Sequence, residues 1–499
     1  MELNQMLSNL QNLQMEMHAY AQAQGCLYFD SATIAPRGSA EARGVTLGIL
    51  SEKSYQLLVN ENTRALLNEL WAHEAELSQP VRRQVELLRE DLDELTRIPM
   101  EEYVAYTKLT NEASEAWRTA KETDNYPLFA PLLKQVIAYQ RRFAAYKDAT
   151  KPAYDVLLDG YEKGMSTALL DEFFGMLRKE LVPLIASVKD QPAQAAFVSA
   201  CCPVAKQREL SDMLMQLMGI DRMHCALSET EHPFTLGMSK FDMRITTHYH
   251  EHAFLSSMYS VVHESGHALY EMDIDDELQY TCLADGASMG MHESQSRFYE
   301  NMVGHSKGFL AFLSPKLREL FPEALGDVSN EALYTAANRV EPSLIRTEAD
   351  EVTYPLHVMI RYELEKQLIA GTLSVEELPE KWNALYKEYL GIEVPNNTLG
   401  VLQDMHWSDG SFGYFPTYAL GSAYAAQFMA KLRQSVDVDT LLAKGELAPI
   451  TAWLKANVHR YGKLYKPAQL LEKACGEPFQ PKYYVAHLSQ KIKDVYSAK

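Results

Sequence analysis

The sequence has few cysteines, and their spacing excludes two common classes of site. Six cysteines are spread over 499 residues, and no two of them form a C-x-x-C pair. Pairs of that kind are typical of structural zinc ribbons and of redox motifs, so neither is expected. In a chain of this length, scattered cysteines indicate buried thiols rather than a disulfide framework.

Long apolar runs and an excess of basic residues are also missing. No run of 18 apolar residues occurs, which argues against a membrane span. The opening residues, MELNQMLSNLQNLQMEMHAY, show no basic region followed by an apolar one, so no secretory signal is predicted. The net charge of −20 argues against nucleic acid or an anionic membrane as a partner, because phosphate binding needs a basic surface. We therefore expect a cytoplasmic protein.

What is present is enough apolar sequence for a large helical protein. The 499 residues are 47% hydrophobic and exceed the usual size of a single core, so two lobes are expected. Helical spacing dominates the first 200 residues. Pro80, Pro99 and Pro127 fall where helices are predicted to begin. No low-complexity linker divides the chain, so residues 1–499 are predicted to form one domain.

Two segments break the helical pattern. Residues 232–251, HPFTLGMSKFDMRITTHYHE, combine two-residue alternation with β-branched residues, which predicts a small hairpin or sheet edge. A strand there would form one wall of a cleft beside the segment that follows. The second, from Gly391 to Ser422, is rich in Gly, Pro, Asn and aromatic residues. A long irregular segment in a compact helical protein favours a loop that contributes to a functional site.

The segment SSMYSVVHESGHALYEMD, residues 256–273, predicts a helix that carries a metal site. His263 and His267 lie about 40° apart around the helix axis, and Glu264 lies about 100° from His263. All three residues therefore face away from the apolar stripe of the helix. Two imidazoles one turn apart can share one ion, and a glutamate beside them can act as a base on metal-bound water. The alternative is a pair of histidines satisfied by hydrogen bonds alone.

A zinc hydrolase needs a third protein ligand and one open position. Downstream, LADGASMGMHESQSRFYE offers Asp285, His292 and Glu293, on a second helix predicted to start near Ala287. The spacing alone does not choose between His292 and Glu293.

Six motifs make the chain similar to a known family, the carboxypeptidase Taq family of zinc metallocarboxypeptidases. In chain order they are HPF (232–234), DMRIT (242–246), HESGH (263–267), GMHESQS (290–296), IRTEAD (345–350) and GVLQDMHW (400–407). The resemblance implies that Glu293 completes the metal site with His263 and His267. It also implies one Zn²⁺ per chain, with Co²⁺ as a substitute, and a homodimer that acts on peptides.

The resemblance implies the fold and the reaction as well. The expected fold is mainly α, with two helical lobes around a deep cleft, like angiotensin-converting enzyme and neurolysin. The expected activity is release of single C-terminal amino acids with broad specificity. A zinc-activated water would attack, with Glu264 as general base and later general acid. One departure from the angiotensin-converting enzyme pattern is Arg297, which stands where an aspartate would orient a ligand histidine.

Further roles follow from the motifs. His406 and a tyrosine, Tyr418 in preference to Tyr414, are candidates to hydrogen-bond the oxyanion. Arg244 and Arg346 are candidates to hold the terminal carboxylate, which suits a planar bidentate donor.

Each of these assignments has an alternative. Arg244 and Arg346 could instead form structural ion pairs, with Asp242 and Asp350 respectively. His232 either lines the site or braces the hairpin. The rival functions are an oligoendopeptidase or dipeptidyl carboxypeptidase on the same scaffold, and a binding protein that keeps the metal without turnover.

Overall fold

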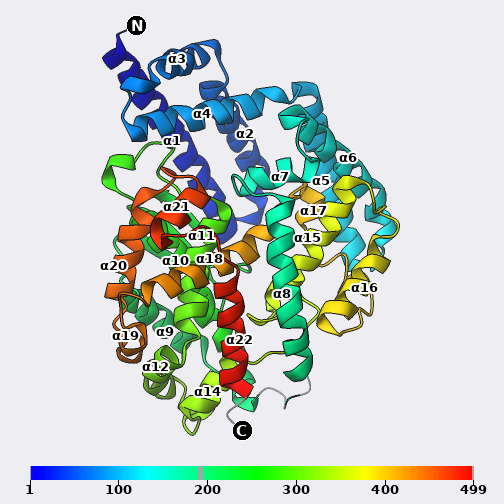
Figure 1. The fold of residues 1–499 in the computed structure, drawn as a ribbon, viewed down its shortest axis with the longest axis vertical. Helices are drawn as coiled ribbons and strands as arrows, with labels where there is room; N and C mark the ends of the chain where they lie inside the picture. The colour runs from blue at the N-terminus through cyan, green and yellow to red at the C-terminus, as the bar shows by residue number, and fades with distance from the viewer. Residues whose placement is uncertain (1, 189–190, 192–194, 497–499) are drawn as a thin grey trace.

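The computed structural model describes residues 2–188, 191 and 195–496, and it is mainly helical (Figure 1). The helices of the first half are α1 (Leu3–Thr33), α2 (Ala40–Leu58), α3 (Glu61–Ala72), α4 (Gln79–Arg97), α5 (Met100–Glu122), α6 (Tyr126–Asp148), α7 (Ala153–Tyr161), α8 (Thr167–Val188), α9 (Val204–Leu217) and α10 (Phe254–Met272). Those of the second half are α11 (Met289–Arg297), α12 (Lys307–Leu320), α13 (Pro322–Leu325), α14 (Asn330–Ala337), α15 (Tyr354–Ala370), α16 (Leu378–Leu390), α17 (His406–Asp409), α18 (Pro416–Leu432), α19 (Val438–Lys444), α20 (Ala448–Asn457), α21 (Pro467–Cys475) and α22 (Lys482–Tyr496). A π-helix, Phe298–Gly304, continues directly from α11.

The prolines mark helix starts as the sequence predicts. Pro80 and Pro127 lie in the first turns of α4 and α6, and Pro99 is the residue before α5. Proline fits there because its missing N–H has no partner in a first turn and its fixed φ suits the helix. The segment expected to be irregular is partly helical, because Pro416 begins α18 inside it.

The predicted hairpin is confirmed and belongs to a small sheet. Strands β2 (Thr235–Ser239) and β3 (Asp242–Thr247) pair antiparallel, with a register shift between Gly237 and Ser239. Strand β1 (Cys225–Glu229), which the sequence pattern did not predict, pairs parallel with β3. The strand order β1-β3-β2 leaves β2 at an edge of the sheet.

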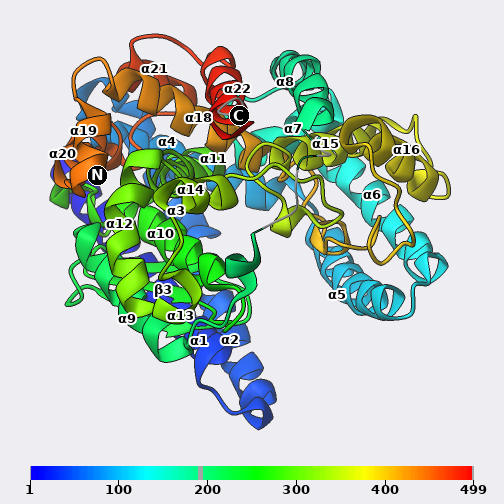
Figure 2. The same cartoon turned by 90° about the horizontal axis from the view of Figure 1, so that it is seen from below.

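The helices gather into two groups when the molecule is seen from below (Figure 2). One group contains α5, α6, α15 and α16, and the other contains α1, α9, α10 and α12. Helix α10 packs against β2 and β3 on one side and against α11 on another. Its buried face, which includes Phe254 and Val261, belongs to the main hydrophobic core. The sheet and α11 therefore meet on the helix that carries the H-E-x-x-H motif.

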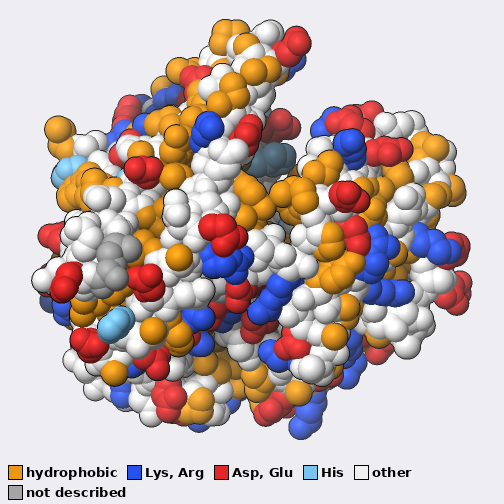
Figure 3. Space-filling model, turned by 90° about the horizontal axis from the view of Figure 1, so that it is seen from above, with side chains coloured by type: hydrophobic (Ala, Val, Ile, Leu, Met, Phe, Trp, Pro, Cys, Tyr) orange, Lys and Arg blue, Asp and Glu red, His pale blue; other side chains and the backbone are white. Residues whose placement is uncertain are grey.

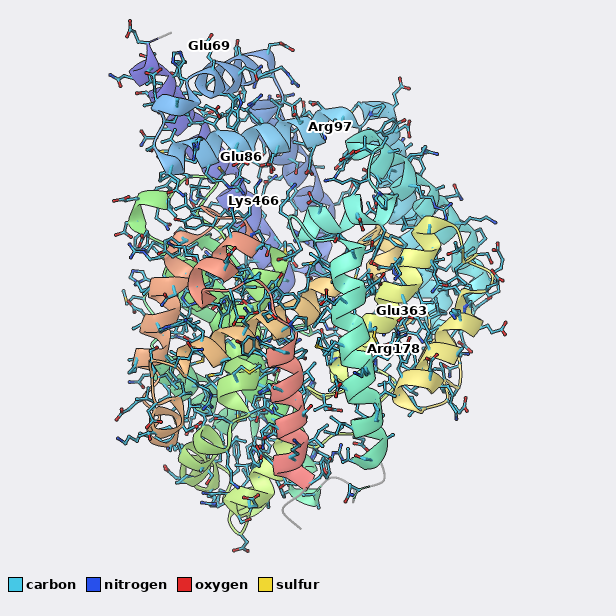
Figure 4. All side chains as sticks on the ribbon, in the orientation of Figure 1. Glu69, Glu86, Arg97, Arg178, Glu363 and Lys466 are labelled. Carbon is cyan, nitrogen blue, oxygen red and sulfur yellow. The ribbon has the colours of Figure 1, made fainter. Side chains whose placement is uncertain are left out.

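Ion pairs join segments that are distant in sequence. Arg178 on α8 lies beside Glu363 on α15 at 3.4 Å, and Lys466 lies 3.2 Å from Glu86 on α4 (Figure 4). Such exposed pairs contribute at most about 1 kcal/mol each. Seen from above, acidic and basic side chains alternate over a hollowed face rather than forming one basic surface (Figure 3). Among the described residues, no helix is long and apolar enough to cross a membrane.

Candidate metal centre and active site

The two histidines of α10 meet a glutamate of α11. His263 Nε2 lies 3.6 Å from Glu293 Oε2, and His267 Nε2 lies 3.5 Å from the same oxygen. These three ligand atoms all lie within 4.8 Å of one another. The structure thus brings together the three residues that the sequence and its family resemblance predict as ligands.

This donor set fits zinc. Tetrahedral zinc with bonds of about 2.0–2.1 Å places neighbouring ligand atoms roughly 3.3–3.4 Å apart. The separations of 3.5 and 3.6 Å are close to that value. Two imidazoles and one carboxylate are the protein ligands of several catalytic zinc sites, which keep one position open.

Two glycines allow the ligands to approach. A Cβ on Gly266 of α10 would lie 2.7 Å from the Gln295 carbonyl oxygen of α11. A Cβ on Gly421 of α18 would lie 2.6 Å from Glu293 Cγ. Both contacts are closer than packed atoms allow, so glycine at these positions lets α10 and α18 close on α11 around Glu293.

The ligand histidines have different outer partners. His263 Nδ1 lies 2.7 Å from Glu300 Oε2, on the π-helix after α11. His267 Nδ1 lies 2.6 Å from His292 Nδ1, and His292 Nε2 lies 3.0 Å from Glu271 Oε1. In both cases the outer nitrogen is held by a hydrogen bond, which leaves Nε2 directed at Glu293. Sequence analysis had not identified Glu300 or Glu271.

Arg297 holds Glu293, the candidate third ligand, rather than a histidine. Its Nε donates to Glu293 Oε1 at 2.7 Å, and its Nη1 donates to Glu300 Oε2 at 3.2 Å. Burial opposes ionisation of Glu293, but Arg297 and His263 together hold its pKa well below the ordinary value. Glu293 is therefore ionised, with one oxygen fixed by Arg297 and the other directed at the histidines, as a metal ligand would need to be.

Glu264 lies next to the ligands and is held by the sheet. The hydroxyl of Thr235 on β2 donates to Glu264 Oε2 at 2.6 Å. Burial raises the pKa of Glu264 above its usual value. A carboxylate with a raised pKa is a better proton acceptor, as a general base requires.

A second group of possible ligands adjoins the first. Glu271, Asp285 and His292 also bring ligand atoms within 4.8 Å of one another. Lys463 Nζ already lies 2.5 Å from Asp285 Oδ2, and His292 is bonded to Glu271. This group is satisfied by protein contacts, and it includes the outer partner of His267.

Two cavities meet at the metal-ligand residues. The first, which we call the arginine cavity, has a volume of about 590 Å³ and is lined by Arg297, Arg339 and Arg346 among others. The second, which we call the strand cavity, has a volume of about 720 Å³ and is lined by β2 and α1. The residues that line both cavities are Pro233, His263, Glu264, Glu293 and Tyr418.

The three residues predicted to hydrogen-bond the oxyanion differ in which cavities they line. Tyr418 lines both cavities, and Tyr414 lines the strand cavity. His406 is not among the described residues that line either cavity, and its Nε2 lies 3.4 Å from Tyr418 Oη. Burial lowers the pKa of His406 to about 4, so its ring is neutral at pH 7. His406 therefore contacts the Tyr418 hydroxyl without lining either cavity itself.

The two candidate arginines also differ. Arg346 lines the arginine cavity, and its Nε and Nη2 donate to Asp404 Oδ1 at 3.1 and 2.9 Å. Arg244 donates to both oxygens of Asp242 at 2.9 Å, and it is not among the described residues lining the two cavities. His232 is exposed and is likewise absent from both linings, although the adjacent Pro233 is present in each.

Comparison with known proteins places the chain in a family. Residues 9–492 match the model of the carboxypeptidase Taq (M32) metallopeptidase family. The chain is 39% identical over 480 residues to "Carboxypeptidase 1" of Bacillus subtilis, with 96% of each covered. It is 37% identical to "Thermostable carboxypeptidase 1" of Thermus thermophilus, with 98% of each covered. Its structure matches the M32 carboxypeptidase of Deinococcus radiodurans with a TM-score of 0.96 and 31% identity, over 99% of this chain and 100% of that one. The chain therefore belongs to the carboxypeptidase Taq (M32) metallopeptidase family.

Proposed function

We propose that this metallocarboxypeptidase uses His263, His267 and Glu293 to hold one zinc ion and releases single amino acids from peptide C-termini with broad specificity. The observation that carries the proposal is the uneven distribution of cationic side chains, Arg346 above all, between the two cavities that meet at these residues. Arg297, Arg339, Arg346 and Lys491 line the arginine cavity, whereas Lys240 is the single lysine or arginine among the described residues of the strand cavity. Acidic side chains line both cavities, so the free carboxylate is assigned to the arginine cavity on the position of Arg346.

Arg346 is suited to receive that carboxylate. Three of its five N–H groups are used, two by Asp404 and one by Tyr354 Oη at 3.2 Å. One N–H on each terminal nitrogen remains available to a carboxylate. Asp404 is shared with Arg361 at 2.7 Å, so the buried group of two arginines and one aspartate keeps a net positive charge. Arg244 remains a second prediction for this role.

The rest of the peptide would occupy the strand cavity. β2 is an edge strand, and edge strands offer free backbone groups to an extended peptide. In this binding mode the scissile bond would lie between the cavities, beside Glu264 and the proposed metal ligands. A substrate bound this way loses only the residue that lies in the arginine cavity.

The chemistry divides between the metal and the side chains. A bound zinc ion supplies Lewis acidity, which polarises the scissile carbonyl and makes water a stronger nucleophile at neutral pH. Glu264 takes the proton from the attacking water and then delivers it to the leaving amine. Thr235 keeps the Glu264 carboxylate directed at the site through its 2.6 Å hydrogen bond.

Tyr418 is the proposed donor to the oxyanion. It lines both cavities, and burial raises its pKa well above the usual value, so it keeps its proton at pH 7. His406, in contact with the Tyr418 hydroxyl, would position it, and Tyr414 remains the alternative donor. A fixed donor aimed at developing charge typically contributes about 10²–10³-fold in rate.

Some implications of the family resemblance stay predictions. These are a homodimer, a cytoplasmic location, replacement of zinc by Co²⁺, and a two-lobed cleft similar to that of angiotensin-converting enzyme and neurolysin. Light scattering of the purified protein at several concentrations would test the homodimer.

A mixed peptide pool tests the proposed function. The metal-loaded protein should shorten peptides one C-terminal residue at a time, which mass spectrometry resolves as a ladder. Loss of two residues per step would indicate a dipeptidyl carboxypeptidase, and internal fragments would indicate an oligoendopeptidase. No cleavage by a metal-replete protein would favour a binding role.

A further inference from the structure

Glu271 lies two imidazole rings away from the proposed zinc position, at the end of a continuous row of hydrogen bonds. His267 Nδ1 lies 2.6 Å from His292 Nδ1, and His292 Nε2 lies 3.0 Å from Glu271 Oε1. The side chains of His267, His292 and Glu271 are only 16%, 19% and 19% exposed. Water therefore competes little for these bonds, and each is stronger than it would be in solvent.

The metal role of His267 determines where its proton lies. A neutral imidazole carries one N–H, and a metal ligand must present the nitrogen that lacks it. His267 directs Nε2 at Glu293 Oε2, 3.5 Å away, so its proton is on Nδ1 when Nε2 binds zinc. The Nδ1 atoms of His267 and His292 are 2.6 Å apart, which leaves room for one proton between them. His292 Nδ1 is then the acceptor of this hydrogen bond.

The same reasoning determines the tautomer of the second ring. With Nδ1 as an acceptor, the single N–H of neutral His292 is on Nε2, and it donates to Glu271 Oε1. An ionised carboxylate has only acceptor atoms, so it suits this end of the row. Both hydrogen bonds therefore run outward from the zinc position, from His267 to His292 and from His292 to Glu271.

We propose that Glu271 is a positioning residue for the zinc site, which holds His292 in the tautomer that His267 needs. The proposal rests on the metal assignment of the proposed function, because it takes His267 Nε2 as a ligand. The other tautomer of His292 would set N–H against N–H at 2.6 Å and push the His267 ring out of place. Partners that orient a ligand in this way typically contribute 10- to 100-fold in metal affinity.

Two glycines leave the space that the row occupies. A Cβ on Gly237 of β2 would overlap Glu271 Oε2, and a Cβ on Gly286 would lie 2.6 Å from His292 Cδ2. Packed atoms do not approach so closely. The edge strand therefore confines the Glu271 carboxylate, and Gly237→Ala would displace it. That substitution disturbs the row without changing any of its three members.

Zinc affinity, measured by chelator competition with the metal-stripped protein, tests the proposal without using activity. Glu271→Ala should lower the affinity roughly 10-fold, at the lower end of the usual range because Glu271 acts through a second ring. Glu271→Gln keeps an oxygen acceptor for His292 Nε2 and should restore most of the lost affinity. Glu277→Ala removes an exposed carboxylate outside both described linings and is the matched control. Thermal midpoints of the metal-stripped proteins report on folding.

A double-mutant cycle separates positioning from a general loss of stability. Because Glu271 acts through His292, Glu271→Ala should change zinc affinity by less than roughly 2-fold when His292→Ala is already present. Gly237→Ala should lower the affinity of the wild type and leave that of Glu271→Ala unchanged. NMR of the histidine side chains in the zinc-loaded protein should show His292 protonated at Nε2 and unprotonated at Nδ1.

The outcomes separate the positioning role from the metal assignment. Equal zinc affinities in Glu271→Ala and Glu277→Ala would overturn the role of Glu271, as would equal losses from Glu271→Ala with and without His292→Ala. A proton on His292 Nδ1, or a Glu271→Gln protein that binds zinc as weakly as Glu271→Ala, would also overturn it. Each of these results leaves the metal ligands in place. Undiminished zinc affinity in His267→Ala would instead overturn the metal assignment of the proposed function, and the positioning role would fall with it.

Discussion

Residues of the metal site divide into those that the sequence identifies and those that only folding reveals. His263, Glu264 and His267 lie within five residues, so helical periodicity alone predicts their common face. Glu293 needed the family resemblance, because spacing did not distinguish it from His292. Glu300 gave no signal, because its contact with His263 depends on the π-helix after α11, and a π-helix has no clear sequence pattern.

The third ligand is tested by metal content. Glu293→Ala removes a charged ligand and should lose zinc during dialysis. His292→Ala removes only an outer partner of His267 and should still take up one zinc per chain at saturating metal. Elemental analysis of both variants decides the question. Full metal in Glu293→Ala together with loss in His292→Ala would show that the ligand assignment is wrong.

The general base is tested by a near-isosteric change. Glu264→Gln keeps the size of the side chain but cannot accept a proton. Its kcat should fall on the order of 10²-fold or more, with metal content unchanged. Turnover near the wild-type level in a metal-replete Glu264→Gln protein would remove Glu264 from the mechanism.

The role of Glu300 is tested by zinc affinity. Glu300→Gln weakens the hydrogen bond that orients His263 and should lower zinc affinity by roughly 10- to 100-fold. Chelator competition with the metal-stripped protein measures this directly. Glu348→Gln, an exposed residue of the same cavity, is the control. Equal affinities in the two variants would show that Glu300 does not position the ligand.

The first turn of α11, the helix that carries Glu293, is held in place by two hydrogen bonds. The Ser288 hydroxyl accepts from Met291 N, and the buried Glu162 carboxylate accepts from Gly290 N at 3.0 Å. Both contacts satisfy N–H groups that the first turn of a helix leaves free.

The sequence predicted a helix starting near Ala287, close to the observed start at Met289. Glu162 was not predicted, since it is 128 residues from Gly290. Strand β1 was missed for a related reason, because its position depends on pairing with β3.

Glu162 gives the stability of the protein a pH dependence. Burial raises the pKa of Glu162 to about 7, whereas an unfolded glutamate titrates near about 4.3. Between these values the folded state holds a proton that the unfolded state has lost. This contribution to the unfolding free energy is full below about pH 4 and is lost as pH rises to about 7, at roughly 1.4 kcal/mol per pH unit.

Urea unfolding of the wild type and Glu162→Gln at several pH values tests this contribution. The variant has no proton to lose, so its midpoint should fall less between pH 5 and pH 7 than that of the wild type. Parallel pH dependences would show that Glu162 titrates normally in the folded protein.

At the scale of the whole molecule, the feature that bears on which end of a peptide is attacked is the position of the cationic residues around the arginine cavity. The composition gave a helical protein with a net charge of −20, but it gave no sign that cationic residues gather on one side of the metal ligands. That asymmetry arises because the end of α11, a loop and a short 3₁₀-helix (Arg346–Glu348), which lie far apart in the chain, place Arg297, Arg339 and Arg346 around one cavity. No local pattern predicts such an arrangement. The direction of attack is therefore the central claim that the fold adds to the motifs.

The most direct test of that claim is a kinetic comparison of one short peptide in free-acid, C-terminally amidated and N-acetylated forms. Amidation removes the charge and one acceptor oxygen that Arg346 would bind. A charged hydrogen bond contributes about 1.5–3 kcal/mol, so kcat/KM should fall roughly 10- to 150-fold. Acetylation should change kcat/KM little, because the N-terminus would lie in the strand cavity, away from Arg346. Equal cleavage of acid and amide, or a strong effect of acetylation instead, would contradict the account.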